Sequence, residues 1–236
     1  MDKISELIGS HFPGLGKVDI KRLAAGFENL DEHELGMLLH AGEGARKRGM
    51  RVLLAFLGAA PDVYKHLEND DFEKWLDLAR KVSKLSVSCC EGFFDSSKAI
   101  IDKGELELLE YWTNTGISLA EQNKWMSIAY FKHTGKVIIS TTPEEFHELV
   151  ENGRKIGEIN VKVAEAYFEQ LLQLKSLLKD GNFARFCHIT GNVIKNHWLT
   201  AIELINLAVK VLPDVNQERI ESLPEWIKSM NSGNFL

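Results

Sequence analysis

The sequence repeats itself every 37 residues over most of its length. The segment FEKWLDLARKVSKLSVSCCEGFF, at residues 72–94, shows the repeat best, because shifts of 37 residues align it with earlier and later segments without a gap. Such shifts take Phe72 to Leu109, Phe146 and Phe183, and take Trp75 to Trp112, Leu149 and Phe186. Self-similarity at a fixed period of about 20–50 residues is the signature of stacked repeats. It therefore constrains the fold more than any local motif does.

Apolar residues within each repeat fall into two sets with helical spacing. The first set occupies repeat positions 1, 4, 8 and 11, and the second occupies positions 19, 22, 23, 26 and 29 or 30. We therefore expect two antiparallel helices of about 13 and about 17 residues, joined by a tight turn. The five repeats are predicted at 35–71, 72–108, 109–145, 146–182 and 183–219.

Residues that commonly cap helices occupy the predicted junctions. The first helices are preceded by Asp31 or by Thr142, and the second helices by Ser86, Asn123 or Asn160. A short polar side chain at an N-cap accepts a hydrogen bond from a free backbone N–H, which contributes about 1 kcal/mol. The junctions therefore support the two-helix repeat.

Both ends of the chain fit the repeat poorly. Within the first segment, 1–34, only residues 17–30 have helical spacing; in the last segment, 220–236, Pro224 opens a short helix with Trp226, and a tail follows from Asn231. Terminal segments of a repeat array must cover an open apolar face. The predicted fold is all-α, a superhelical array of about five 37-residue antiparallel helix pairs with N- and C-terminal capping helices, in one continuous domain.

Position 8 of the repeat is held by small residues. Because glycine inside a helix costs roughly 1 kcal/mol relative to alanine, we expect a close approach of the two helices of a pair there. Aromatic residues at positions 4, 22 and 23 are expected to fill the spaces between pairs. The residues at position 8 are Gly42, Ala79, Gly116, Gly153 and Thr190.

The third repeat resembles the tetratricopeptide repeat. Trp112, Gly116, Ser127, Phe131 and Thr134 follow the tetratricopeptide order of Trp, small, small, Phe and small residues. The period here is 37 residues, whereas that of the family is about 34, and the proline usual at the repeat end occurs only as Pro143. The resemblance implies an α-solenoid whose first helices line a concave face.

The repeat is also similar to helical segments that accompany von Willebrand A domains in proteins of the nitric oxide reductase activation type. Leu119-Ala120 and Tyr130-Phe131 carry this second resemblance. The 236 residues contain no sequence of the von Willebrand A type. The resemblance therefore implies the repeat alone.

Composition excludes several classes of function. A net charge of −6 argues against non-specific binding of nucleic acid. The first residues lack a signal peptide, and no apolar run reaches about 18 residues, so we expect no membrane association. Three cysteines, two of them adjacent, suit a reducing compartment. We expect a cytoplasmic protein; its oligomeric state is not evident from the sequence.

No arrangement of residues indicates catalysis. His188 and His197 are too far apart on a helix to share a metal ion, and Cys89-Cys90 occupy positions that other repeats fill with small or apolar residues. Gly42 and Gly44 lie in a helical pattern and form no phosphate-binding loop. We therefore expect no enzymatic activity, no catalytic residue, no metal and no cofactor.

The resemblance to tetratricopeptide arrays places an apolar row and several cations on the concave face. Arginine binds carboxylates through a bidentate fork, so these residues could hold an acidic peptide; a solvated basic face without a ligand is the alternative. The candidate binding residues are Arg46, Lys47, Arg80, Lys84, Arg154 and Leu76.

Two hypotheses about function follow. The first is a non-enzymatic scaffold that binds a protein or peptide, for example an acidic one, in the groove of the array. The second is a helical bundle that encloses a small apolar ligand among aromatic side chains. The aromatic residues of the second hypothesis are Trp75, Trp112, Trp125, Tyr130 and Tyr167.

Overall fold

The chain folds into helices joined by turns. The computed structural model describes residues 3–67, 69–104, 106–178, 181–212, 220 and 222–225, and no strand occurs among them. The prediction of an all-α fold is thus confirmed. The chain divides into two compact units, Met1–Ile117 and Ser118–Leu236, which are described separately below. The single continuous domain with five repeats stays a prediction.

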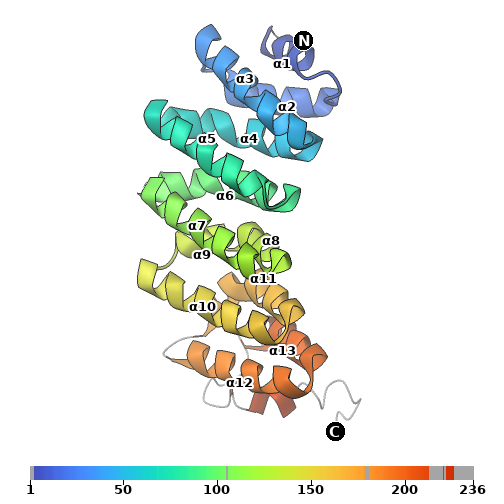
Figure 1. The fold of residues 1–236 in the computed structure, drawn as a ribbon, viewed down its shortest axis with the longest axis vertical. Coiled ribbons are helices and arrows are strands. Elements are labelled where there is room, and N and C mark those ends of the chain that lie inside the picture. Colours follow the sequence, from blue (N-terminus) through green and yellow to red (C-terminus); the bar gives the residue numbers. More distant parts are fainter. Residues whose placement is uncertain are drawn as a thin grey trace. The chain divides into compact units, whose positions relative to one another are not determined.

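Unit 1 contains two layers of helices. In the second layer, α4 packs against α6, and each of them packs against the preceding helix of the first layer, α3 or α5 (Figure 1). The shorter helix α2 packs on both α1 and α4. The helices of this unit are α1 (Lys3–His11), α2 (Lys17–Phe27), α3 (Glu32–Arg48), α4 (Met50–His66), α5 (Asn69–Ser83), α6 (Val87–Gly104) and most of α7 (Leu106–Gln122).

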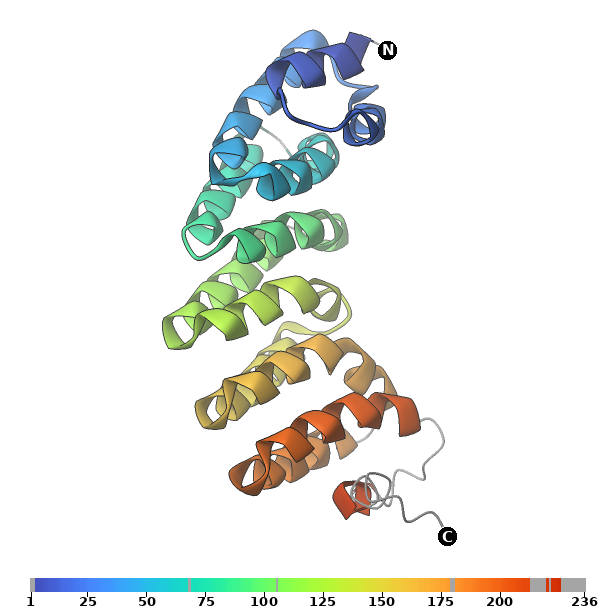
Figure 2. The ribbon, with the colours of Figure 1, turned by 90° about the vertical axis from the view of Figure 1, so that its right-hand side faces the viewer.

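Unit 2 is built in a similar way. Here α11 packs against α8 on one side and α13 on the other, while α10 packs on α11 and α12 packs on α13. Figure 2 shows the stacking of successive helix pairs within each unit. The remaining helices are α8 (Lys124–His133), α9 (Gly135–Ile138), α10 (Pro143–Ile159), α11 (Val161–Leu177), α12 (Asn182–Asn196) and α13 (Trp198–Val211).

The helix starts have a regular spacing. The second helices of the pairs, α4, α6, α8, α11 and α13, begin at residues 50, 87, 124, 161 and 198, each 37 residues after the one before. The first helices α3, α5, α7 and α10 begin at residues 32, 69, 106 and 143, three residues before the predicted repeat boundaries. They are 15 to 17 residues long and not about 13. In α3, α5 and α10 the additional residues at the start are polar or proline, so they carry no apolar signal.

The predicted caps are present. Asp31 accepts hydrogen bonds from the backbone N–H groups of His33 and Glu34, both at 2.8 Å, and the Glu34 carboxylate accepts one from Asp31 N in a capping box. Gly49, which precedes α4, has φ +130°, a conformation that L side chains rarely adopt. The other predicted caps that accept a backbone N–H are Ser86, Asn123, Thr142 and Asn160.

Two local features differ from the expectation. Helix α1 lies in a segment without a clear helical pattern; its Ile8 is buried, and Phe12, just after the helix, lies against Gly42 of α3. The second helix of the third predicted repeat ends as α8 at Thr134, whose hydroxyl donates to the carbonyl of Tyr130, and α9 follows directly. At the C-terminus, Ile220 and Leu223 are buried; the predicted Trp226 and the tail lie outside the described residues.

Position 8 of the repeat is a site of close approach, but its neighbour is an aromatic ring and not a second small residue. A Cβ atom on Gly153 of α10 would lie 2.5 Å from Cζ of Phe168 on α11. A Cβ atom on Gly42 would lie 2.8 Å from Cζ of Phe12 and 3.4 Å from Cε1 of Phe56. Aromatic residues of the second helices thus fill the space within a pair as well as between pairs.

Candidate functional site

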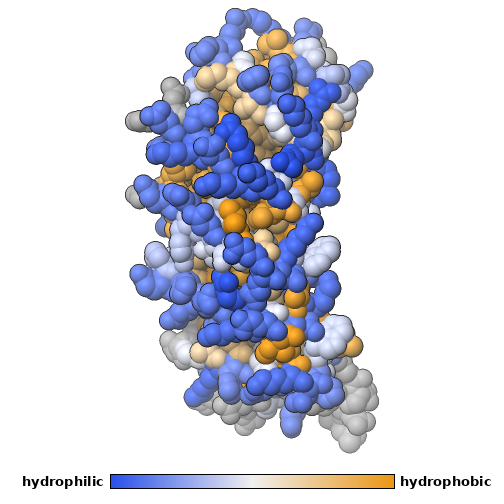
Figure 3. Space-filling model, viewed as in Figure 1, coloured by the Kyte–Doolittle hydropathy of each residue, from blue (hydrophilic) through white to orange (hydrophobic). Residues whose placement is uncertain are grey.

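An open groove lies in unit 1 between α3 and α5. It has a volume of about 790 Å³ and is lined by residues of α3 between His40 and Arg48 and by residues between Leu76 and Lys84, on the second half of α5 and just after it. Its floor is apolar and comes from the layer behind, with Val52 and Phe56 of α4 and Phe94 of α6. Hydrophobic atoms are visible between hydrophilic side chains in this region, in the upper part of Figure 3.

Small residues on the first helices keep the groove open. The residues of α3 and α5 that line it include Ala41, Gly44, Ala45 and Ala79. A Cβ atom built on Gly44 would have no neighbour within 4 Å, so this glycine faces open space. A larger side chain at these positions would take up space in the groove.

The groove is rich in positive charge. Lys47 and Arg48 of α3 and Lys84 after α5 are exposed, and none of these three side chains forms an ion pair or a hydrogen bond with the part of the chain that the structure describes. Arg80 differs, because it binds Asp77 and lies 4.0 Å from a carboxylate oxygen of Glu73.

One acidic side chain also lines the groove. The carboxylate of Glu43 lies 3.1 Å from Nε2 of His11 and 3.7 Å from Nδ1 of His40. It therefore faces two histidines and does not neutralise the three lysine and arginine side chains by an ion pair.

The structure brings four of the six predicted site residues together. Leu76, Lys47, Arg80 and Lys84 all line the groove. Arg46 is exposed on α3 but does not line it. Whether any of these residues binds a partner stays a prediction.

Arg154, the sixth predicted site residue, belongs to unit 2. Its Nε donates to Glu151 at 2.9 Å, and its Nη2 donates to the hydroxyl of Ser118 at 3.3 Å. The side chain is about three-quarters buried, so Arg154 holds its own surroundings together and is not part of the groove.

Sequence reasoning missed Arg48 and the aromatic floor. Arg48 is the last residue of α3, one position beyond those expected to face a ligand. Phe56 and Phe94 were assigned to the core, and they are almost fully buried there. Their ring edges nevertheless line the groove, a double role that the repeat pattern does not indicate.

The thiol on the groove floor lacks the lowered pKa of a reactive cysteine. Burial raises the pKa of Cys90 to about 12, and the positive charge of Arg48 opposes this by a smaller amount. A reactive cysteine needs a lowered pKa. Packing therefore accounts for Cys90.

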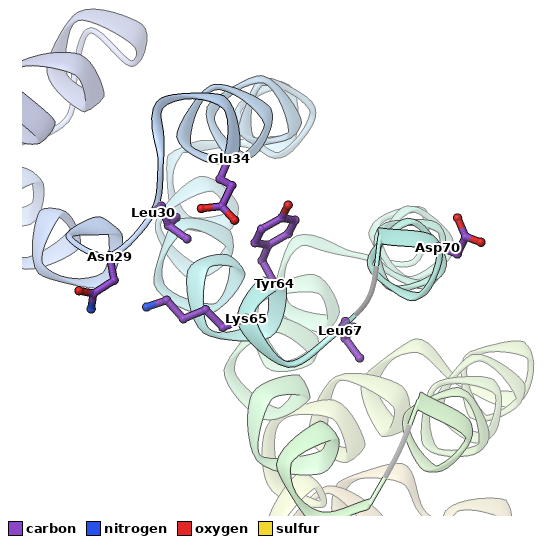
Figure 4. Close-up of a pocket in the computed structure, with 7 residues that line it drawn as sticks. All are labelled: Asn29, Leu30, Glu34, Tyr64, Lys65, Leu67 and Asp70. Carbon is purple, nitrogen blue, oxygen red and sulfur yellow. The ribbon is translucent and has the colours of Figure 1, made fainter.

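A second hollow of about 730 Å³ lies at the other end of α3, near the start of α5 (Figure 4). Glu34 and Tyr64 face each other in it, whereas Asp70 points away. The Glu34 carboxylate already accepts a hydrogen bond from Asp31 N, and Nζ of Lys65 donates to the carbonyl of Gly26 at 3.4 Å. Because these polar groups are engaged, the groove between α3 and α5 is the better candidate.

The aromatic residues of the small-ligand hypothesis do not line either hollow. Trp75, Trp112, Tyr130 and Tyr167 are fully buried core residues. Trp125 is 57% exposed, with Nζ of Lys162 located 5.5 Å from its ring centroid.

The described ranges contain no group of three or more His, Cys, Asp or Glu side chains placed to hold a metal ion. Within the same ranges, no helix has the length and apolar character needed to cross a membrane.

Comparison with family models, with curated proteins and with solved structures gives no match to this chain. The function is therefore inferred from the groove.

Proposed function

We propose that this chain is a non-enzymatic scaffold of the tetratricopeptide-like type, and that a protein or peptide partner binds in the groove between α3 and α5. The repeat architecture is supported by the 37-residue spacing of helix starts and by the packing of α4 on α6 and of α11 on α8 and α13. The similarity to repeats of von Willebrand A-domain proteins is part of the same proposal. Three free thiols suit a reducing compartment, so we place the protein in the cytoplasm.

The observation that carries the binding proposal is an open hollow with an apolar floor. Phe56, Phe94 and Leu76 line an open hollow of about 790 Å³, within the range of about 300–1,000 Å³ typical of ligand pockets. Removing apolar surface at the base of a concave site from water is favourable, so it stabilises a bound partner. The thiol of Cys90 also lines the groove, and burial raises its pKa. A thiol with a raised pKa is a poor nucleophile, which supports a binding function over a catalytic one.

Blocking the groove tests this function. The substitution Gly44→Leu places a side chain into open space within the groove and replaces glycine by a better helix former. Gly36→Leu is the matched control, because Gly36 also lies on α3, faces open space and does not line the groove. Each tagged protein is used to capture partners from native lysate, and its folding is checked by circular dichroism.

We expect one partner to be retained by the wild type and by Gly36→Leu and to be lost by Gly44→Leu. A partner held equally by all three proteins would place binding elsewhere and refute the groove as the site.

A further inference from the structure

The unpaired cations of the groove lie on both of its sides. Lys47 and Arg48 belong to α3, and Lys84 follows α5. Four lysine or arginine side chains and one carboxylate, that of Glu43, line the groove, whereas the whole chain has a net charge of −6. The groove is therefore positively charged, although the chain as a whole is negatively charged.

The ion pairs of the structure decide which of these cations are available. Arg80 is held by Asp77 and is close to Glu73, both on its own helix. An incoming anion would compete with these two carboxylates for Arg80. Lys47, Arg48 and Lys84 have no such competitor among the described residues, so they are the groups that a partner's carboxylates can bind without displacing another.

The apolar floor of the groove determines which side chain a partner must present. Phe56 and Phe94 pack edge to face, with ring centroids 5.5 Å apart, and Val52 lies beside them in the lining. This floor can take an apolar side chain, while charged groups next to that side chain reach the cations at the two sides. A volume of about 790 Å³ holds a few residues of a partner.

From these observations we propose that the groove selects a short acidic protein segment, in which carboxylates stand on both sides of an apolar anchor residue. Lys47, Arg48 and Lys84 bind the carboxylates, and Phe56 and Phe94 receive the anchor. This proposal rests on the proposed function and names the chemical class of its partner. Single-stranded nucleic acid is less suited, because no exposed Phe, Tyr or Trp side chain lines the groove for base stacking.

Three labelled peptides test the charge selection. Each carries a central leucine; the flanking residues are Glu in the first peptide, Gln in the second and Lys in the third. Binding to the full chain is measured by fluorescence anisotropy at about 50 mM and about 300 mM NaCl. We expect the Glu peptide to bind roughly tenfold more tightly than the Gln peptide at the lower salt concentration, because its carboxylates form ion pairs with the exposed cations. The advantage should shrink at the higher one.

A charge-reversal variant identifies the residues. Lys47→Glu/Lys84→Glu should weaken binding of the Glu peptide about tenfold or more. Lys132→Glu/Lys136→Glu, a matched change of two exposed lysines in unit 2, should leave it unchanged. Because both double variants change the net charge of the protein equally, this control separates the effect of the groove residues from that of net charge. Urea unfolding of both variants verifies that they remain folded.

The outcomes separate the two proposals. If the Glu and Gln peptides bind equally and both are lost in Gly44→Leu, acidic selection is refuted while the scaffold function stands. If no peptide binds, or a single-stranded oligonucleotide binds in place of the peptides and is lost in Lys47→Glu/Lys84→Glu, the acidic segment is refuted. The lysate experiment with Gly44→Leu then decides the scaffold function separately.

Discussion

Gly153 provides the sharpest test of how the helix pairs pack. It is buried on α10, and a Cβ atom there would lie 2.5 Å and 2.8 Å from Cζ and Cε1 of Phe168 and 3.0 Å from Cε1 of Tyr167. Both rings are fully buried on α11, so neither can swing into solvent. Gly153→Ala should therefore destabilise the protein, although alanine is the better helix former.

The magnitude follows from two opposing terms. Replacing glycine by alanine inside a helix gains about 1 kcal/mol, and overpacking of a buried site costs about 1–3 kcal/mol. The rings are held in place, since the Tyr167 hydroxyl donates to the carbonyl of Leu149 at 2.9 Å and Phe168 packs edge to face on Tyr130. We therefore expect the overpacking cost to lie at the upper end of its range, for a net loss of about 2 kcal/mol.

Urea unfolding monitored by circular dichroism measures this loss. Gly191→Ala in α12 is the control without a neighbour within 4 Å, and it should gain up to about 1 kcal/mol. Gly157→Ala, also on α10, meets the flexible end of Met126, so its loss should be smaller than that of Gly153→Ala. An unfolding free energy of Gly153→Ala equal to or above that of the wild type would refute the close-approach reasoning.

The remaining predictions concern the core, the caps and the thiols. Trp112→Ala should lose about 3–5 kcal/mol of unfolding free energy because it leaves a buried cavity, whereas the exposed Trp125→Ala should lose under about 1 kcal/mol; urea titration compares them. Asn160→Ala should lose about 1 kcal/mol with its cap bonds to α11, and Asn160→Asp should retain it. Burial raises the pKa of both Cys90 and Cys187 to about 12, while unfolded thiols ionise near pH 8.5. The unfolding free energy should therefore fall as pH rises from about 9 towards 12, and less steeply in Cys90→Ala/Cys187→Ala; equal slopes would contradict this.

Sequence periodicity was enough to predict the helical class and many of the helix starts. Apolar spacing depends on one face of each helix, and caps such as Asp31 and Asn160 are local signals, so both can be recognised without tertiary information. Helix α1 escaped detection because its nine residues offer too few turns for a pattern. The interruption at Thr134 is equally hidden, since the apolar residues Val137 and Ile138 continue the helical pattern beyond it.

The site was harder to predict because it depends on side-chain partners. Repeat positions grouped Lys47, Lys84 and Leu76, and all three line one groove. They could not show that Arg80 is bound by Asp77, because that pair depends on the rotamers of two exposed side chains. They also could not show that Arg154 is bound by Glu151 and Ser118 and does not line the groove, because a repeat position does not reveal the hydrogen-bond partners of its side chain.

Two glycines of α3 show how the same residue type serves opposite purposes. Gly42 and Gly44 are two residues apart and therefore about 200° apart around the helix. Gly42 is in contact with the core, where a Cβ atom would lie 2.8 Å from Phe12, so packing accounts for it. Gly44 has no neighbour within 4 Å, so packing does not account for its cost of about 1 kcal/mol relative to alanine. What a glycine at that position does provide is open space in the groove that Phe56 and Phe94 also line, which is the property that a binding groove requires.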